Sequence, residues 1–271
     1  MSALVADIFI YPIKSLGGFS VEEWPVMEEG LLHDRQWMLV DESGNFLTQR
    51  NLPQMALLKV QSFDFDAKSF EVFSSKTQSR MVIPTDLLNQ NSRMVKVWED
   101  VVNAFVYPDS INDWFSKELG FTCYLVKKDE NAIRQVDRKY AAANISTSFS
   151  DGYPILVVSE SSLMDLNKRL NVAVPMNRFR PNIVLSGTKA FEEDGCHELQ
   201  FKEIRLNLVK PCARCIVTTI NQDTAEKSPE PLRTLSTFRA VEHKILFGMN
   251  ALVKTTGKIR RNEEVHLLQS T

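Results

Sequence analysis

Short apolar segments, each bounded by turn-forming residues, recur through the first hundred residues of the chain. Residues 4–13 are dense in apolar and β-branched side chains and run into a turn over 12–18, which predicts a strand. Residues 46–49 are predicted to return antiparallel to a strand at 37–40, because 41–45 is rich in turn formers. Further short strands are predicted at 55–60, 69–73, 81–83 and 94–97. This spacing is typical of an all-β or barrel-like unit.

The pattern changes to a helical one at residue 109. Apolar residues over 109–119 recur at helical intervals after a Ser/Asp cap, and Gly120 is placed to end the helix. A strand at 122–126 and a polar segment at 127–139 follow. We therefore expect an N-terminal β-barrel-like domain over 1–121 and a second domain over 122–271.

The second half combines strands with a few helices, so the fold class is α+β and strand-rich. A strand is predicted at 153–158, and Ser159 would cap a helix that places Leu163, Leu166 and Leu170 on one face. Another strand is predicted at 183–186. Alternation over 201–208 predicts a strand that Pro211 ends, and the β-branched segment 216–220 predicts the next one.

Charge and cysteine content exclude several classes of protein. The chain has 32 Lys and Arg against 34 Asp and Glu, so nothing draws it in bulk to nucleic acid or anionic lipid, and any anionic ligand needs a local cluster of cations. Four cysteines are too few for a disulfide framework. The N-terminus lacks a basic signal region and no apolar run approaches the roughly 20 residues of a membrane span. We expect a cytoplasmic protein without nucleic-acid or membrane partners.

Cys212 and Cys215 form the most reactive motif, a Cys-x-x-Cys pair. A thioredoxin-type site is disfavoured because 216–220 is a poor start for the helix that it needs. A structural zinc site would require Cys196 and His197 at irregular spacing. The remaining alternatives are one thiolate that ligates a soft metal beside a structural cysteine, and two inert core cysteines. The composition of the motif does not separate these two.

Basic residues supply candidate anion contacts. Arg178 and Arg180 lie two residues apart, which on an extended segment means the same side, and Asn182 follows them. Two aligned guanidiniums suit a phosphate, although a pair of solvated surface arginines is the commoner outcome. Lys14 and Ser15, next to two glycines, are a second candidate. No dinucleotide, Walker A, zinc-protease or serine-hydrolase motif is present.

Several motifs in order resemble one known family. The segment 210–224 (KPCARCIVTTINQDT), with PLRTL at 231–235 and FG at 247–248, resembles the MOSC domain, the molybdenum-cofactor sulfurase C-terminal family. Upstream, YPIKS at 11–15 and HDRQW at 33–37 resemble the N-terminal β-barrel domain that precedes it, and the likeness continues through DGYP at 151–154 and NRFRPN at 177–182. Bacterial YcbX-type proteins and mitochondrial amidoxime-reducing components are similar in layout.

The resemblance implies a molybdenum cofactor, with its molybdopterin, between two β-barrel domains. The family pattern makes Cys215 the catalytic residue and the ligand to molybdenum, with Cys212 in support. It maps cofactor contacts onto further residues: Lys14, Ser15, Arg35, Asp151, Gly152, Arg178, Arg180, Asn182 and, at the molybdenum end, Asn250. A pyridoxal phosphate-binding superfamily label is left open.

The function that the resemblance implies is reduction of N-oxygenated small molecules, such as N-hydroxylated bases or amidoximes, by oxygen-atom transfer to molybdenum. The chain has no four-cysteine iron–sulfur spacing and lacks the ferredoxin-like domain of YcbX-type proteins. Its electrons would come from a ferredoxin-, flavodoxin- or cytochrome b5-type donor with its reductase. It also lacks the targeting and membrane segment of the mitochondrial members, which fits a bacterial-type soluble protein. The alternative is a carrier of molybdenum cofactor or sulfur without turnover of its own.

Overall fold

The computed structural model describes residues 3–87 and 91–269, and strands dominate it, which confirms a strand-rich α+β fold. The first eleven strands are β1 (Ala3–Ile10), β2 (Phe19–Ser20), β3 (Glu23–Met27), β4 (Gly30–Leu31), β5 (Trp37–Val40), β6 (Leu58–Asp64), β7 (Ser69–Ser74), β8 (Arg80–Pro84), β9 (Ser92–Val97), β10 (Asp100–Val106) and β11 (Tyr124–Lys128). The others are β12 (Ile155–Ser159), β13 (Ile183–Ser186), β14 (Cys196–Gln200), β15 (Arg205–Ala213), β16 (Ala240–Val241), β17 (Lys244–Thr255), β18 (Gly257–Arg260) and β19 (Glu264–Gln269).

The helices are few and short. The α-helices are α1 (Asp109–Leu119), α2 (Glu160–Arg169) and α3 (Leu232–Ser236), and the 3₁₀ helices are η1 (Pro53–Leu57), η2 (Met176–Arg178), η3 (Glu192–Gly195) and η4 (Ile216–Thr219). As predicted, Gly120 ends α1 in the left-handed conformation and the Ser159 side chain caps α2 by accepting from the Ser162 amide. Leu163, Leu166 and Leu170 lie together in the core beneath α2, also as predicted.

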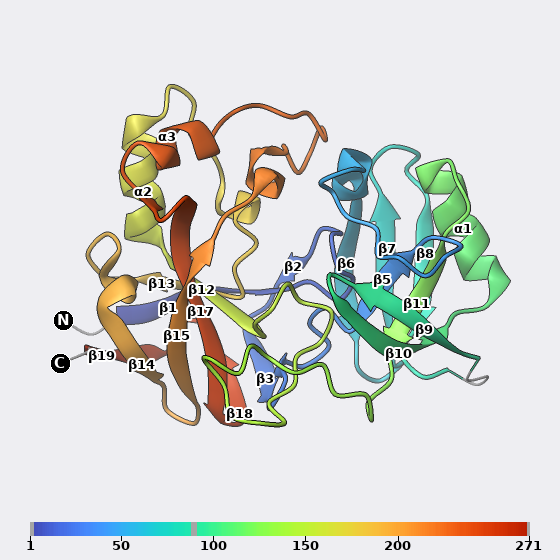
Figure 1. Ribbon diagram of the computed structural model, residues 1–271, viewed down its shortest axis with the longest axis horizontal. Helices are drawn as coiled ribbons and strands as arrows, with labels where there is room; N and C mark the ends of the chain where they lie inside the picture. Colours follow the sequence, from blue (N-terminus) through green and yellow to red (C-terminus); the bar gives the residue numbers. More distant parts are fainter. Residues whose placement is uncertain (1–2, 88–90, 270–271) are drawn as a thin grey trace.

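Seven strands close into a barrel. They pair in the order β12-β13-β1-β19-β14-β15-β17, and β17 pairs again with β12. The N-terminal strand β1 thus lies between β13 and β19. Both chain termini lie at the barrel end of the molecule (Figure 1). β12 is buried along its whole length because it pairs on both sides and α2 covers it.

The other end of the molecule contains two smaller sheets and α1 (Figure 1). One sheet has the order β5-β11-β10-β9 and the other β6-β7-β8. Trp37 and Phe115 are fully buried in the core between them. The expected division into 1–121 and 122–271 stays a prediction.

The structure corrects several predicted elements in the N-terminal half. Residues 46–49 return antiparallel to β5 as predicted, with a Val40–Phe46 bridge and a 2.8 Å hydrogen bond from the Leu47 amide to the Leu39 carbonyl. They form no regular strand, because the Phe46 amide donates to the Lys96 carbonyl. Residues 55–57 belong to η1, which Pro53 begins, so β6 starts only at Leu58. No side chain caps α1, whose N-cap is Pro108.

Two corrections affect the cysteine motif directly. Pro211 does not end its strand, because β15 accommodates it at a register shift opposite Met249 and continues to Ala213. Residues 216–219 form η4 rather than a strand. The hydroxyls of Thr218 and Thr219 donate to the carbonyls three residues earlier, at 3.0 and 2.7 Å, and so stabilise the turn despite the β-branched sequence.

Six strands of four residues or more lie where none was predicted: β3, β10, β14, β17, β18 and β19. β14 and β15 are joined by a tight turn in which the Phe201 amide donates to the Ile204 carbonyl, so the predicted strand over 201–208 begins only at Arg205.

Candidate functional site

Lys14 lies in the turn that follows β1. The turn is fixed because the Lys14 amide donates to the Trp37 carbonyl at 2.8 Å, and Ser15 takes a positive φ of 66°. The Lys14 side chain is 5% exposed, and its Nζ lies 2.5 Å from Asp151 Oδ1 and 2.9 Å from the Phe149 carbonyl. Burial lowers the pKa of the Lys14 ammonium, and the Asp151 carboxylate opposes that shift. A buried cation and a carboxylate at the surface therefore form one ion pair.

Asp151 belongs to the loop before β12. Its side chain is 70% exposed at the rim. Desolvation of the carboxyl raises the pKa of Asp151, but the Lys14 ammonium, together with Arg50 and Arg35, outweighs that effect and holds the pKa well below its usual range. The loop is anchored by Arg134, whose Nη1 donates to the carbonyls of Ser148 and Ser150 at 2.9 and 2.5 Å.

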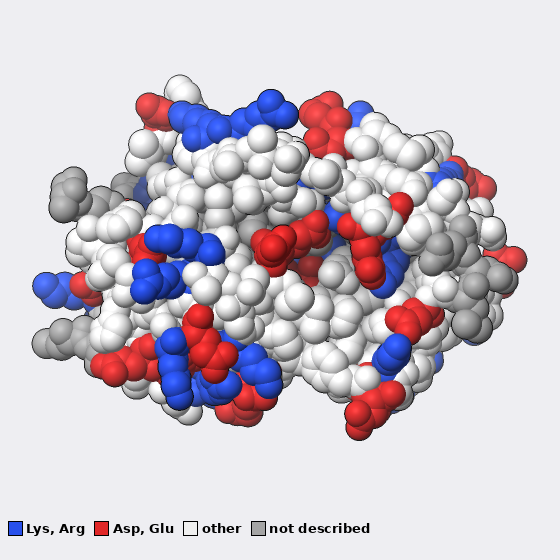
Figure 2. All heavy atoms as spheres, turned by 90° about the horizontal axis from the view of Figure 1, so that it is seen from below, with Lys and Arg blue, Asp and Glu red and all other residues white. Residues whose placement is uncertain are grey.

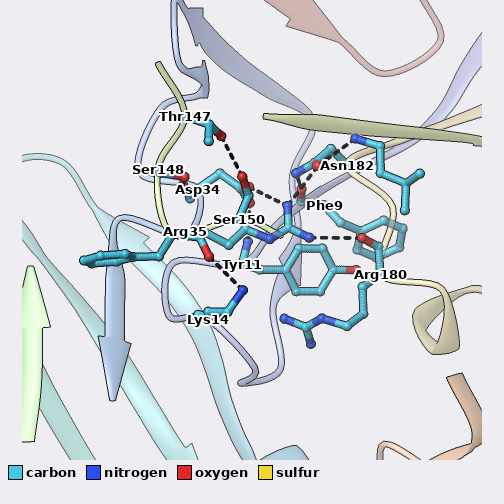
Figure 3. A network of polar contacts seen from close by, with 12 residues as sticks. Phe9, Tyr11, Lys14, Asp34, Arg35, Thr147, Ser148, Ser150, Arg180 and Asn182 are labelled. Atoms are coloured by element: carbon cyan, nitrogen blue, oxygen red, sulfur yellow. Dashed lines mark hydrogen bonds and ion pairs between the residues drawn. The ribbon is translucent and has the colours of Figure 1, made fainter. Parts of the chain in front are cut away.

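Arg35 and Arg180 meet from distant parts of the sequence. Arg35 Nη1 donates to Asn182 Oδ1 at 2.8 Å and Nη2 to the Arg180 carbonyl at 3.1 Å, and Arg35 also pairs with the buried Asp34 carboxylate (Figure 3). Both arginines take positive φ angles, 50° and 54°. Such conformations cost about 1–3 kcal/mol each in residues other than glycine and cluster at functional sites. The surrounding contacts hold both guanidiniums in place.

Arg180 differs from Arg35 in its counter-charge. Its Nη1 donates to the Leu16 carbonyl at 2.6 Å, and none of the ion pairs among residues 3–87 and 91–269 includes it. Burial lowers the pKa of the Arg180 guanidinium to about 10. The Asp34 and Asp151 carboxylates act on this charge only from beyond ion-pair distance, so the guanidinium has no direct counterion in the described structure.

Cys212 and Cys215 reach the site from the end of β15. Both thiols are half-buried. Arg214 Nη1 donates to Cys212 Sγ at 3.1 Å, and Arg214 Nη2 donates to the Phe179 carbonyl at 2.6 Å. The Cys215 carbonyl accepts from the Thr218 amide and hydroxyl, which fixes its backbone, while no hydrogen bond in the described part of the chain involves its thiol.

These residues surround one cavity of about 130 Å³ between the barrel and the smaller sheets. Ten of the eleven predicted site residues line it: Lys14, Ser15, Arg35, Asp151, Gly152, Arg180, Asn182, Cys212, Cys215 and Asn250. Asn250 reaches it from β17, where it pairs with Leu156 and Lys210. The structure brings together residues that are up to 236 positions apart in the sequence, counted from Lys14 to Asn250.

Arg178 is the exception. It belongs to η2 and does not follow the extended geometry that would align it with Arg180. Its Nε donates to the Thr218 carbonyl at 2.7 Å and its Nη2 to the Glu230 carbonyl at 3.2 Å. The prediction that both guanidiniums face one ligand is therefore wrong. Arg178 instead anchors η4, the segment that follows Cys215.

Sequence reasoning missed several residues that line the cavity. Arg50 stacks over the Trp98 ring, with its guanidinium carbon 4.3 Å from the ring centre, and Arg214 adds a further cation. Three buried polar atoms of lining residues lack a hydrogen-bond partner within the described structure, namely Trp98 Nε1, Tyr153 Oη and Arg214 Nε. Arg214 could have been noticed because it lies inside the Cys-x-x-Cys motif. Arg50 and Trp98 carry no motif of their own.

The concentration of cations is local. Figure 2 shows lysines and arginines interspersed with carboxylates on the face seen from below, in line with a net charge of −2. Five of the residues that line the cavity are basic, whereas one, Asp151, is acidic. The cavity is thus suited to an anion.

The zinc alternative for the cysteines is wrong. Across residues 3–87 and 91–269, no three His, Cys, Asp or Glu side chains are placed to hold a metal ion together. Cys196 is buried in the barrel core, where its thiol donates to the Glu192 carbonyl at 3.3 Å.

None of the helices in the described ranges is both long enough and apolar enough to span a membrane.

Comparison with known proteins covers nearly the whole chain. Residues 2–122 match the family model of the MOSC N-terminal beta barrel domain, and residues 144–266 match that of the MOSC domain. Neither description mentions pyridoxal phosphate, so that label has no support.

Two kinds of curated relative match along most of the chain. Molybdenum cofactor sulfurase of Oryza sativa subsp. japonica is 33% identical over 90% of this chain, which spans only 32% of that protein. Mitochondrial amidoxime reducing component 2 is 30% identical in Bos taurus and 32% in Rattus norvegicus, over 97% of this chain and 82% of each relative. The chain therefore spans about a third of the sulfurase and most of each reducing component.

Proposed function

Because this chain belongs to the family in which a MOSC N-terminal beta barrel domain precedes a MOSC domain, we propose that its cavity binds the molybdenum cofactor. We propose further that the protein is an oxidoreductase that reduces N-oxygenated compounds. The names of the relatives, molybdenum cofactor sulfurase and amidoxime reducing component, support the cofactor and the substrate class respectively.

The chemistry of the cavity fits this cofactor. Molybdopterin presents an anionic phosphate and a polar pterin, and the molybdenum takes a soft ligand such as thiolate. The cavity offers cations for the phosphate and unpartnered donors on Trp98 and Arg214 for the pterin. It offers the half-buried thiol of Cys215 for the molybdenum. The observation that carries the proposal is the Arg180 guanidinium, which has no carboxylate partner in the described protein and shares its cavity with Cys215.

Each group has a distinct role in the proposed site. Cys215 would ligate the molybdenum, with its backbone held by Thr218 and η4 held by Arg178. Lys14, Ser15, Arg35 and Arg180 would bind the phosphate, and Asn182 would orient Arg35 through the 2.8 Å hydrogen bond between them.

The remaining predicted contacts lie on the same cavity. Asp151 and Gly152 would border the pterin, Asn250 would lie at the molybdenum end, and Cys212 would support Cys215. When bound, the cofactor supplies the two-electron chemistry that removes oxygen from the substrate nitrogen. A separate ferredoxin-, flavodoxin- or cytochrome b5-type protein would deliver the electrons.

Metal and pterin analysis tests the proposal. Wild type, Cys215→Ala and the matched control Cys212→Ala are purified from a host that makes ample cofactor. We expect near-stoichiometric molybdenum and fluorescent pterin in the wild type, nearly complete loss of molybdenum in Cys215→Ala, and a smaller loss in Cys212→Ala. Equal molybdenum in the wild type and Cys215→Ala would show that Cys215 is not the ligand.

A carrier function is the second candidate, since the sulfurase match covers 90% of this chain, against 97% for the reducing component. The two functions differ in turnover. The loaded protein is given an N-hydroxylated base and an artificial reductant, and the reduced base is measured. Reduction supports the enzyme, whereas full cofactor occupancy without reduction supports the carrier.

A further inference from the structure

Tyr11 lies between the two arginines that meet at the cavity. The guanidinium carbons of Arg35 and Arg180 are each 4.4 Å from the centre of its ring. Figure 3 shows the ring with one guanidinium on either side. Two cations therefore share one aromatic side chain, and their guanidinium carbons are at most about 9 Å apart, twice the measured distance to the ring.

The ring itself has little freedom to move. Tyr11 is 3% exposed, and its amide donates to the buried Asp34 carboxylate at 2.9 Å. A side chain at position 18 would collide with it, because a Cβ built on Gly18 would lie 2.5 Å from the ring. The absence of a side chain at Gly18 thus leaves the space that the ring occupies.

The ring lies between two guanidiniums that repel each other because both are positively charged. Arg35 has Asp34 as its counterion, but Arg180 makes no ion pair among the described residues, and the two cations approach each other in a partly buried place. An aromatic face attracts a cation, and one ring presents two faces. The ring attracts both guanidiniums while it keeps them apart.

We propose that Tyr11 is a positioning residue, whose ring holds Arg35 and Arg180 at a fixed separation so that an oxyanion meets a pre-formed clamp. The proposal deepens the proposed function, because it takes the anion in the cell to be the phosphate of the cofactor. Tyr11 itself need not touch the ligand. Its hydroxyl is buried without a hydrogen-bond partner in the described structure, so the ring and not the hydroxyl carries the role.

Arginine side-chain NMR tests the stacking in solution. A ring on which two guanidiniums stack shifts their Nε–H proton signals upfield through its ring current. We expect two such signals in the folded wild type, assigned with Arg35→Lys and Arg180→Lys, and their retention in Tyr11→Phe. If both signals lie at ordinary positions in the wild type, the stacked clamp does not exist. This measurement does not require a destabilised variant.

Phosphate binding tests the positioning role. The probe is inorganic phosphate, titrated by calorimetry into full-length protein made in a host without the cofactor. We expect Tyr11→Leu to weaken phosphate binding by about tenfold and Tyr11→Phe to restore it. The control is Phe238→Leu, which removes a ring 4.1 Å from the Arg169 guanidinium carbon, away from the residues that line the cavity. It should leave phosphate binding unchanged.

Other outcomes would overturn the proposal. Folded Tyr11→Leu with wild-type affinity would show that the ring is dispensable, and equal losses in the Leu and Phe variants would assign the effect to the hydroxyl. No phosphate binding by the wild type would also count against the clamp. A different result would refute the proposed function. If protein purified from a cofactor-producing host contains neither molybdenum nor pterin, the proposed function is wrong, even where phosphate binding depends on the Tyr11 ring.

Discussion

Four cations that line the cavity fall into two groups that the protein holds in different ways. Lys14 pairs with Asp151 and Arg35 pairs with Asp34, so each cation of this first group has a carboxylate counterion. Arg180 and Arg214, the second group, contact backbone carbonyls, aromatic rings and a thiol, and make no ion pair among the described residues. The comparison indicates that the first group stabilises the fold in addition to facing the ligand, whereas the second group serves mainly an anionic ligand.

Removal of Arg35 should have the largest effect on stability. Arg35→Ala leaves the Asp34 carboxylate, whose side chain is 2% exposed, without its counterion. We expect the free energy of unfolding to fall by about 3–5 kcal/mol, measured by urea denaturation of the cofactor-free protein. A second change, Asp34→Asn, should recover part of the loss because it removes the unpaired charge. A loss below about 1 kcal/mol would place Arg35 with Arg180 and Arg214, the cations that serve mainly the ligand.

Removal of Arg180 should instead affect ligand retention. Arg180→Ala takes away a charge that makes no ion pair in the described structure, so the cofactor-free protein should unfold at nearly the wild-type urea concentration. Cofactor retention should weaken by about 1.5–3 kcal/mol, the value of one hydrogen bond to a charged group. Released pterin per protein measures it, and Arg169→Ala, which changes a half-exposed arginine of α2, is the control. If Arg180→Ala retains its pterin but unfolds more easily, Arg180 serves the fold and not the ligand.

The Lys14–Asp151 pair should give the smallest effect, and one that depends on pH. Because the pKa of Asp151 is lowered in the folded protein, the pair stabilises the fold above about pH 4 and this contribution is lost as the pH falls further. Asp151 is 70% exposed, so we expect less than about 1 kcal/mol. Thermal unfolding of wild type and Asp151→Asn between pH 3 and 7 measures it. Parallel curves would show that the pair does not contribute.

The family resemblance in the sequence allowed half of the cavity lining to be predicted, because motif order identifies residues that only the fold brings together. Lys14 and Cys215 lie 201 positions apart and still line one cavity, and the strand-rich α+β fold was also predicted correctly. Their roles toward a cofactor remain predictions.

Local patterns failed where tertiary contacts decide the backbone. Arg178 and Arg180 have the spacing of a strand face, but η2 and the left-handed Arg180 send the two guanidiniums apart. The segment 216–220 has strand propensity, yet threonine hydroxyls and Arg178 stabilise η4. Arg50 and Trp98 lie on separate segments, and no pattern within either predicts that they meet.

The position of β1 in the barrel has a consequence for biosynthesis. β1 is synthesised long before its partners, which are Ile183–Ser186 of β13 and Glu264 and Val265 of β19. The barrel therefore cannot close until β19 has been translated. Until then β1 and the strands it will join have unpaired edges, which are prone to pair with other chains. Nascent protein should depend on chaperones for longer than a barrel built from consecutive strands would.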